Sequence, residues 1–144
     1  MSFREKSAWV CLVSTLVVFV PYFFNVARID AAGALQMGAV VGLLVAAIFF
    51  QAVLTGGAMI AVAIHSGADN ADERDRAIEL RSYRNAYGVL AFSLVTAVCV
   101  MMFAPPSWAP HLTLPFASQV FFACFVAAEA VKYLTQVVSY RRGF

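Results

Sequence analysis

Residues 7–27, SAWVCLVSTLVVFVPYFFNVA, form an uninterrupted stretch of 21 uncharged and mostly apolar residues. Two longer stretches without a charged side chain follow, at residues 31–68 and 85–128. About 18 to 20 such residues are enough for an α-helix to cross the hydrocarbon core of a bilayer. Across the chain, 62% of the 144 residues are hydrophobic and 12% are charged, whereas about 25% of the residues in soluble domains are charged. The chain is therefore expected to be a multi-pass membrane protein.

The breaks between the apolar stretches predict four transmembrane helices in one domain that covers residues 1–144. Three prolines between Pro105 and Pro110 exclude a helix there, because proline lacks the amide proton that a helix needs. The Gly56-Gly57 pair leaves too few residues for a further crossing, so the second span is expected to be one long helix. We predict an all-α integral membrane fold, an antiparallel four-helix bundle with spans at residues 7–27, 34–62, 86–104 and 113–138. Too few residues remain outside the bilayer for a soluble catalytic domain or a nucleic-acid-binding module.

The basic residues are distributed unevenly over the two sides that this topology creates. Nine of the ten lysines and arginines fall at the termini or between the second and third spans, and only Arg28 falls on the other side. Basic residues near the ends of spans favour the cytoplasmic side. We therefore expect both termini and the polar segment at residues 69–85 to be cytoplasmic, in the inner membrane of a bacterial-type cell.

The polar segment at residues 69–85 carries nine of the eighteen charged residues. Its acidic residues come first and its basic residues follow, as the dipole of an α-helix favours. Because no glycine or proline intervenes before the third span, we expect one continuous rod with an acidic start away from the bilayer. As a functional site, this start would bind a basic cytoplasmic protein through Asp72, Glu73, Asp75, Arg76 and Glu79. The structural alternative is a solvated helix start whose Arg81 and Arg84 contact lipid phosphates.

Residues 72–87, DERDRAIELRSYRNAY, and residues 4–9, REKSAW, also resemble the motifs of a known family. The family consists of small prokaryotic four-span membrane proteins that form a domain of unknown function. Its shared feature is an Asp-Glu-Arg-Asp run that leads through Ile-Glu-Leu/Ala-Arg into the next span. The resemblance covers most of the chain and rests on these two motifs and the topology. It implies a four-span architecture and an association with small helix-turn-helix regulators encoded nearby, and it implies no catalytic residues.

Ionisable residues at membrane depth are functional candidates by default, and the last span contains Glu129 and Lys132. At about 100° per residue, these two share one helix face with Tyr133, Gln136 and Tyr140. If the membrane boundary lies at Tyr140, the carboxyl group of Glu129 is deep enough to be a proton or cation site. If the boundary lies near Tyr133, Lys132 neutralises Glu129 and reaches towards lipid phosphates.

Two glutamines and a stripe of small residues lie inside the predicted spans. Gln51 and Gln119 favour hydrogen bonds between helices, and lining a transport path is the alternative. The second span carries small residues at a spacing of four, namely Ala34, Gly38, Gly42 and Ala46. Such a stripe lets helices approach closely, either within the chain or in a homodimer.

The remaining residues give no support for catalysis or for a metal centre. His65 has no second histidine or suitably spaced cysteine nearby, and His111 falls on the opposite side of the membrane from the acidic segment. We therefore expect no catalytic residues, no metal and no cofactor. The sequence favours a non-enzymatic binding or regulatory protein, with the lipid bilayer and a cytoplasmic protein as partners and no direct contact with nucleic acid. The alternative is a small oligomeric proton-coupled transporter or ion-conducting protein that uses Glu129.

Overall fold

The computed structural model describes residues 3–31, 36–66, 72–108 and 111–142. These ranges contain four long helices, α1 (Phe3–Ala31), α2 (Met37–Ser66), α3 (Glu73–Met102) and α4 (Leu114–Arg142). A short 3-10 helix, η1 (Pro106–Trp108), lies where the prolines were predicted to exclude a helix, because proline is tolerated in a first helical turn, where its missing N–H would have no partner. Each long helix is apolar and long enough to cross a membrane. The predicted all-α fold, with four helices long and apolar enough to span a membrane, is thus confirmed.

The four helices are longer than the hydrocarbon core of a bilayer is thick. They are 29 or 30 residues long, or about 44 Å at 1.5 Å per residue, against a hydrocarbon core of about 30 Å. Gly56 and Gly57 lie inside α2, so the prediction of one long second helix is confirmed. The charged segment and the third span also form one helix, α3, as predicted. Residues 69–71 of the predicted polar helix lie outside the described residues.

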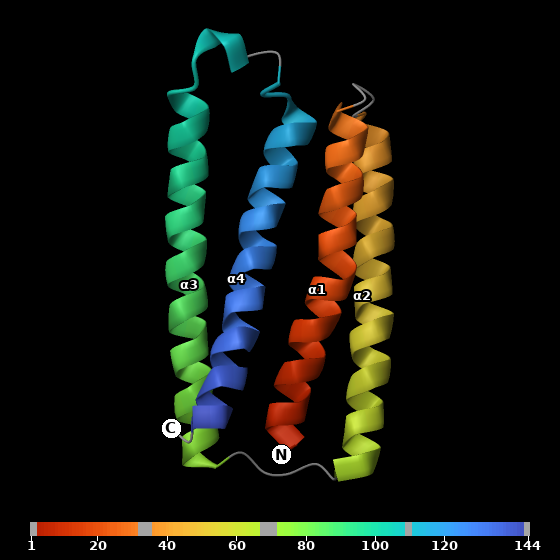
Figure 1. Ribbon diagram of the computed structural model, residues 1–144, viewed down its shortest axis with the longest axis vertical. Helices are drawn as coiled ribbons and strands as arrows, with labels where there is room; N and C mark the ends of the chain where they lie inside the picture. The colour runs from red at the N-terminus through yellow and green to blue at the C-terminus, as the bar shows by residue number, and fades with distance from the viewer. Residues whose placement is uncertain (1–2, 32–35, 67–71, 109–110, 143–144) are drawn as a thin grey trace.

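The helices stand side by side in the order α2, α1, α4, α3, each antiparallel to its neighbours (Figure 1). The extensive packing is between α1 and α2, between α1 and α4, and between α3 and α4. The central helices α1 and α4 therefore pack on two sides, whereas α2 and α3 each pack extensively against one neighbour. The outer helices expose many apolar side chains, which costs little in a bilayer because lipid tails are as apolar as leucine.

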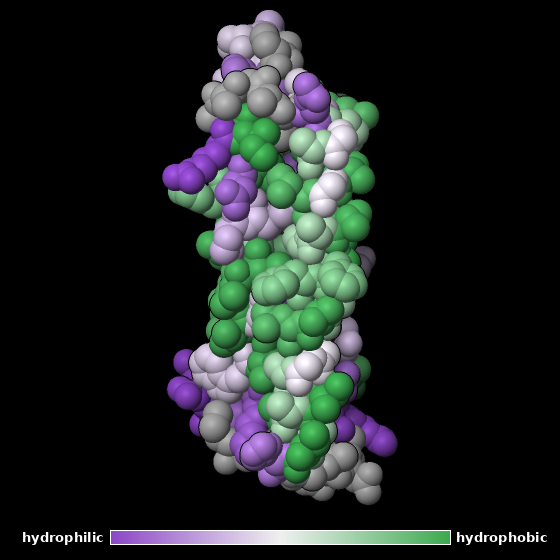
Figure 2. Space-filling model, turned by 90° about the vertical axis from the view of Figure 1, so that its right-hand side faces the viewer, coloured by the Kyte–Doolittle hydropathy of each residue, from purple (hydrophilic) through white to green (hydrophobic). Residues whose placement is uncertain are grey.

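The two ends of the molecule differ in charge. We call one of them the charged end: it carries the starts of α1 and α3 and the ends of α2 and α4, with most of the basic residues. The opposite end, here the proline end, carries η1 and the end of α1. Figure 2 shows a hydrophobic band across the middle of the molecule and hydrophilic residues towards both ends.

The core lies mainly between α1 and α4. Phe19 and Tyr22 of α1 belong to a buried cluster against which Phe122 of α4 packs, with ring centroids 5.5 and 5.8 Å from that of Phe122. Nearer the charged end, Leu12 of α1 packs with Val137 of α4 in a second cluster. These apolar contacts set the register of α1 against α4 and thereby position the polar side chains of both helices.

Candidate functional site

Asp75, in the first turn of α3, joins three helices at the charged end. Its carboxylate lies 3.1 Å from Nε of Arg4 in α1 and accepts a 3.0 Å hydrogen bond from the hydroxyl of Tyr140 in α4. It also accepts a 3.3 Å hydrogen bond from the backbone N–H of Asp72, and the carboxylate of Asp72 in return accepts the backbone N–H of Asp75, together with that of Glu73 at 2.7 Å. This reciprocal capping box satisfies backbone donors that the first helical turn leaves unpaired. The start of α3 is thereby fixed to both central helices.

The five residues predicted to bind a partner fall into two groups. Asp72, Glu73, Arg76 and Glu79 are exposed, whereas only 18% of the side chain of Asp75 is exposed. Because Asp75 contacts the start of α1 and the end of α4, the start of α3 lies level with these two ends (Figure 1). The predicted binding surface therefore consists of four exposed side chains, and its fifth residue, Asp75, connects the helices.

A polar cavity of about 270 Å³ opens beside this junction, between the helices. Arg4, Asp75, Glu79 and Tyr140 lie at its outer part, and Cys11, Tyr133 and Gln136 line it further along the helices. The cavity thus extends from the charged end towards the ionisable residues of α4.

Glu129 and Lys132 form an ion pair inside the row of helices. Nζ of Lys132 lies 3.2 Å from Oε2 and 3.4 Å from Oε1 of Glu129. It also lies 4.8 Å from the ring centroids of both Tyr83 and Tyr133, and 13% of the Lys132 side chain is exposed. Cation–π contacts of this kind stabilise a partly desolvated ammonium group. Lys132 therefore neutralises Glu129, as one of the two alternatives from the sequence requires. The ammonium group of Lys132 contacts the rings of Tyr83 and Tyr133.

A contact between α3 and α4 shows how far Glu129 lies from the charged part of α3. Nδ2 of Asn85 donates a 3.5 Å hydrogen bond to Thr135, so these residues lie at the same level. Beyond Asn85, α3 carries no charged side chain, and residues 85–102 span about 27 Å, close to the thickness of the hydrocarbon core. Glu129 lies six residues from Thr135 towards the middle of α4, or about 9 Å at 1.5 Å per residue. If the hydrocarbon begins at Asn85, Glu129 lies inside it.

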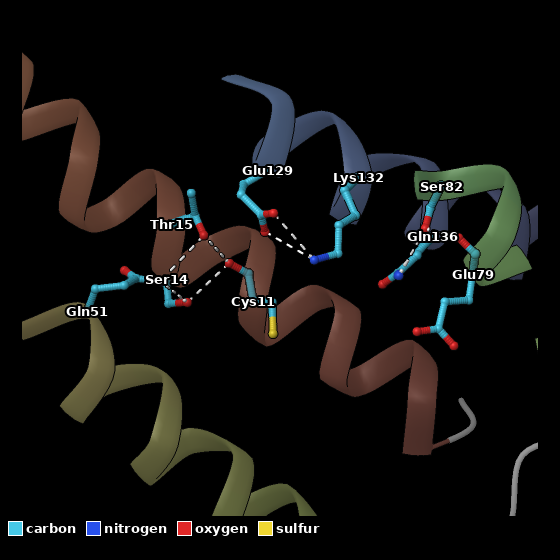
Figure 3. A network of polar contacts seen from close by, with 9 residues as sticks. All are labelled: Cys11, Ser14, Thr15, Gln51, Glu79, Ser82, Glu129, Lys132 and Gln136. Atoms are coloured by element: carbon cyan, nitrogen blue, oxygen red, sulfur yellow. Dashed lines mark hydrogen bonds and ion pairs between the residues drawn. The ribbon is translucent and has the colours of Figure 1, made fainter. Parts of the chain in front are cut away.

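Gln136 joins the polar face of α4 to α3. Its Nε2 donates to Oγ of Ser82 at 3.2 Å, and Ser82 donates to the backbone oxygen of Glu79 at 2.7 Å. Ser82 is completely buried. The structure thus brings the predicted face with Glu129, Lys132 and Gln136 against α1 and α3 (Figure 3).

Gln51 lies in a polar cluster between α2 and α1. Its Nε2 is 3.0 Å from Oγ1 of Thr55, 3.3 Å from Oγ of Ser14 and 3.4 Å from Oγ1 of Thr15, and Ser14 and Thr55 share a 2.9 Å hydrogen bond. Figure 3 shows this cluster on one side of α1 and the pair of Glu129 with its lysine on the other. Polar side chains of all four helices therefore lie between the charged end and the middle of the molecule.

Gln119 belongs to a separate site nearer the proline end. Its Oε1 accepts a buried 2.7 Å hydrogen bond from the hydroxyl of Tyr22. Tyr22 lies seven residues beyond Thr15 along α1, or about 10 Å, and the aromatic contact of Phe19 with Phe122 lies between the two levels. The structure therefore does not bring Gln51 and Gln119 together.

The stripe of small residues on α2 faces away from the other helices. A Cβ atom added to Gly38 or Gly42 would meet nothing within 4 Å, and Gly38, Gly42 and Ala46 are exposed. Ala34 lies outside the described residues. Two uses were predicted for this stripe, packing within the chain and packing in a homodimer. At Gly38 and Gly42, the structure shows no contact with another helix of the chain that would support the first use.

Sequence reasoning missed several residues of these sites: Arg4, Ser14, Thr15, Thr55, Ser82 and Tyr83. None of these residue types is unusual for its segment. Each residue belongs to a site because it contacts a residue on another helix. A signal does exist, because polar residues such as Ser14 and Gln51 fall at matching depths once two spans are paired antiparallel. Within the described ranges, no three His, Cys, Asp or Glu side chains are grouped so that they could hold a metal ion.

Comparisons with protein-family models, with curated proteins and with solved structures found no match to this chain.

Proposed function

We propose that this chain is a non-enzymatic binding or regulatory protein of the inner membrane of a bacterial-type cell, with both termini and the charged end in the cytoplasm. The excess of basic residues at the charged end supports this orientation. A basic cytoplasmic protein would dock on the exposed side chains at the start of α3, which are Asp72, Glu73, Arg76 and Glu79.

The observation that carries this proposal is the junction at Asp75. Because Asp75 contacts Arg4 and Tyr140, the start of α3 is held against two other helices. Binding to a surface that is already ordered loses less conformational entropy than binding to a flexible segment. Charges at fixed positions also select a partner of complementary charge and reject others.

Site-specific photocrosslinking in living cells tests the docking proposal. A photoreactive amino acid in place of Arg76 is expected to give an adduct with one soluble protein, and Glu73→Lys in the same chain is expected to remove that adduct. The matched control carries the photoreactive residue at Ser107, in η1 at the proline end. An adduct that survives Glu73→Lys, or one that also forms from position 107, would contradict docking at the start of α3.

The pair of Glu129 and Lys132 supports a second candidate, a small oligomeric proton-coupled transporter or ion-conducting protein. A carboxylate beside a polar cavity inside the helix row is a site where a proton or cation can bind. Between the level of Glu129 and the proline end, α1 and α4 pack against each other through the apolar rings of Phe19 and Phe122. Transport would therefore need a second chain, for which the exposed Gly38 and Gly42 offer a contact surface.

The two candidates differ in which substitution abolishes the cellular phenotype that follows loss of the chain. Docking predicts that Glu73→Lys abolishes function and that Glu129→Gln preserves it. Transport predicts the reverse pattern. Glu73 suits this test better than Asp72 or Asp75, because these two residues also form the capping box of α3.

A further inference from the structure

A second polar groove lies between α3 and α4 at the charged end. It has a volume of about 250 Å³. Arg81 and Asn85 of α3 and Thr135, Ser139 and Arg142 of α4 supply its polar lining, and Leu134 and Val138 supply its apolar lining. At about 100° per residue, Leu134, Val138 and Arg142 lie on the opposite side of α4 from Tyr133, Gln136 and Tyr140. The groove is therefore distinct from the cavity beside Asp75.

Each polar side chain that lines this groove has at least one hydrogen-bond donor, and none of the lining residues that the structure describes is acidic. Two guanidinium groups present forked N–H donors that match the oxygens of a phosphate. Asn85 has an amide NH₂ group with two hydrogens, one of which goes to Thr135. These donors match the oxygens of a phosphate ester.

The charges of α3 are separated around its axis, which gives the groove its positive character. At about 100° per residue from Arg81, Arg74 and Asn85 lie within about 40°, whereas Asp75 and Glu79 lie about 120° to 160° away. Asp75 and Glu79 line the other cavity. The acidic side of α3 thus faces α1, and its arginine side faces the groove with α4.

The position of the groove along the helices selects a lipid as the source of the phosphate. Asn85 is the first residue of the uncharged segment of α3, so the groove lies where the charged residues give way to apolar ones. Leu134 and Val138 are 50% and 38% exposed at this level. At this level an acyl chain can contact Leu134 and Val138, while the two arginines of the groove contact the headgroup. Basic pockets between spanning helices bind anionic headgroups in this way.

We propose that this groove binds the headgroup phosphate of an anionic phospholipid through Arg81 and Arg142, with Leu134 and Val138 against an acyl chain. The proposal does not depend on docking or transport at the other sites. Arg81 and Arg142 would then bind a specific lipid, in addition to being attracted to any negatively charged membrane surface.

Native mass spectrometry of the purified full chain, titrated with phosphatidylglycerol, tests the site. An arginine near an anionic headgroup is worth about a fivefold change in affinity. Arg142→Gln and Arg81→Gln are each expected to weaken binding of the first lipid by about fivefold, and the double variant by about 25-fold. The matched control is Arg76→Gln, which removes an exposed arginine of the same helix about 140° away around its axis. We expect this control to bind as the unaltered chain does.

Two further probes separate a lipid site from a general phosphate site. Phosphatidylcholine, which carries a phosphate but no net charge, is expected to bind more weakly and equally to all variants. Glycerophosphoglycerol, the headgroup without acyl chains, is expected not to compete at concentrations at which phosphatidylglycerol saturates the site. Equal loss in Arg76→Gln, no loss in the double variant, or full competition by glycerophosphoglycerol or inorganic phosphate would each overturn the proposal. Far-UV circular dichroism of each variant confirms that the helices are intact.

Discussion

Nε of Arg4 lies 3.1 Å from a carboxylate oxygen of Asp75 and thereby connects α1 to α3, two helices that do not pack extensively against each other. The N–H of this nitrogen does not point at the carboxylate in hydrogen-bonding geometry, so the contact is an ion pair only. The hydroxyl of Tyr140 adds a hydrogen bond to the same carboxylate. One carboxylate therefore links the charged ends of three helices in a structure whose extensive helix–helix packing follows the row.

Neutralising Asp75 is expected to destabilise the fold by about 1 to 2 kcal/mol, because Asp75→Asn weakens both the capping box and the ion pair. Arg4 and Asp75 side chains are 32% and 18% exposed, so solvent screens the pair and its own share is at most about 1 kcal/mol. A double-mutant cycle of Asp75→Asn with Arg4→Gln, measured by denaturant unfolding in detergent, gives this coupling. Glu73→Gln is the control and is expected to stay within about 0.5 kcal/mol. Strictly additive effects of the two substitutions would show that the ion pair contributes nothing.

Removing Lys132 alone is expected to cost more than removing Lys132 and Glu129 together. Lys132→Met leaves the carboxylate of Glu129 unpaired inside the helix row, and an uncompensated charge of this kind costs up to about 3 to 5 kcal/mol when fully buried. Because 31% of the Glu129 side chain is exposed, we expect a smaller loss of about 1 to 3 kcal/mol. The variant Glu129→Gln/Lys132→Met is expected to recover more than half of that loss in the same unfolding measurement. A double variant less stable than Lys132→Met would contradict the ion pair.

The presence of four helices that are long and apolar enough to span a membrane follows from the sequence, because hydrophobicity is a property of each segment by itself. The same holds for the face of α4 with Glu129, Lys132 and Gln136, since helical periodicity alone places these residues together. Both features were predicted without any knowledge of a partner helix, and both are seen in the structure.

The order of the helices could not be predicted in the same way. In a membrane protein the lipid-facing and helix-facing sides are both apolar, so nothing in the periodicity of α2 or α3 marks them as outer helices. Arg4 and Asp75 are 71 positions apart, and their contact exists only because α1 and α3 both begin at the charged end. Gln51 and Gln119 show the converse: two similar residues inside spans lie in separate clusters, because their partners Ser14 and Tyr22 differ in depth.

Tyr22→Phe is expected to destabilise the packing of α1 against α4 by about 0.6 kcal/mol and by no more than about 1.7 kcal/mol, the range for hydrogen bonds between membrane helices. The substitution keeps the aromatic contact with Phe122 and removes only the 2.7 Å hydrogen bond to Gln119. Tyr87→Phe is the matched control, because Tyr87 is 73% exposed. Equal unfolding curves for both variants would show that the buried hydrogen bond is replaced at no cost.

The three native cysteines report on access to the polar cavity without any added label site. Cys11 lines the cavity beside Asp75, Cys124 is buried, and Cys99 is exposed on α3 among apolar residues. A small, charged thiosulfonate reagent needs water to reach a thiol. We therefore expect it to modify Cys11 at least about tenfold faster than Cys124 or Cys99, because the latter two face protein and lipid. The modified residues are identified by mass spectrometry, with Cys11→Ala as the control that abolishes the fast reaction.

The side from which this reagent acts also tests the orientation of the chain. With the charged end in the cytoplasm, Cys11 is expected to react in inverted membrane vesicles and to be protected in intact spheroplasts, since the packed rings of Phe19 and Phe122 block access from the proline end. Reaction from the outer side only would reverse the orientation. Equal reaction from both sides would instead show a water path through the membrane, because a charged reagent does not pass between tightly packed apolar rings. That outcome would favour conduction over docking.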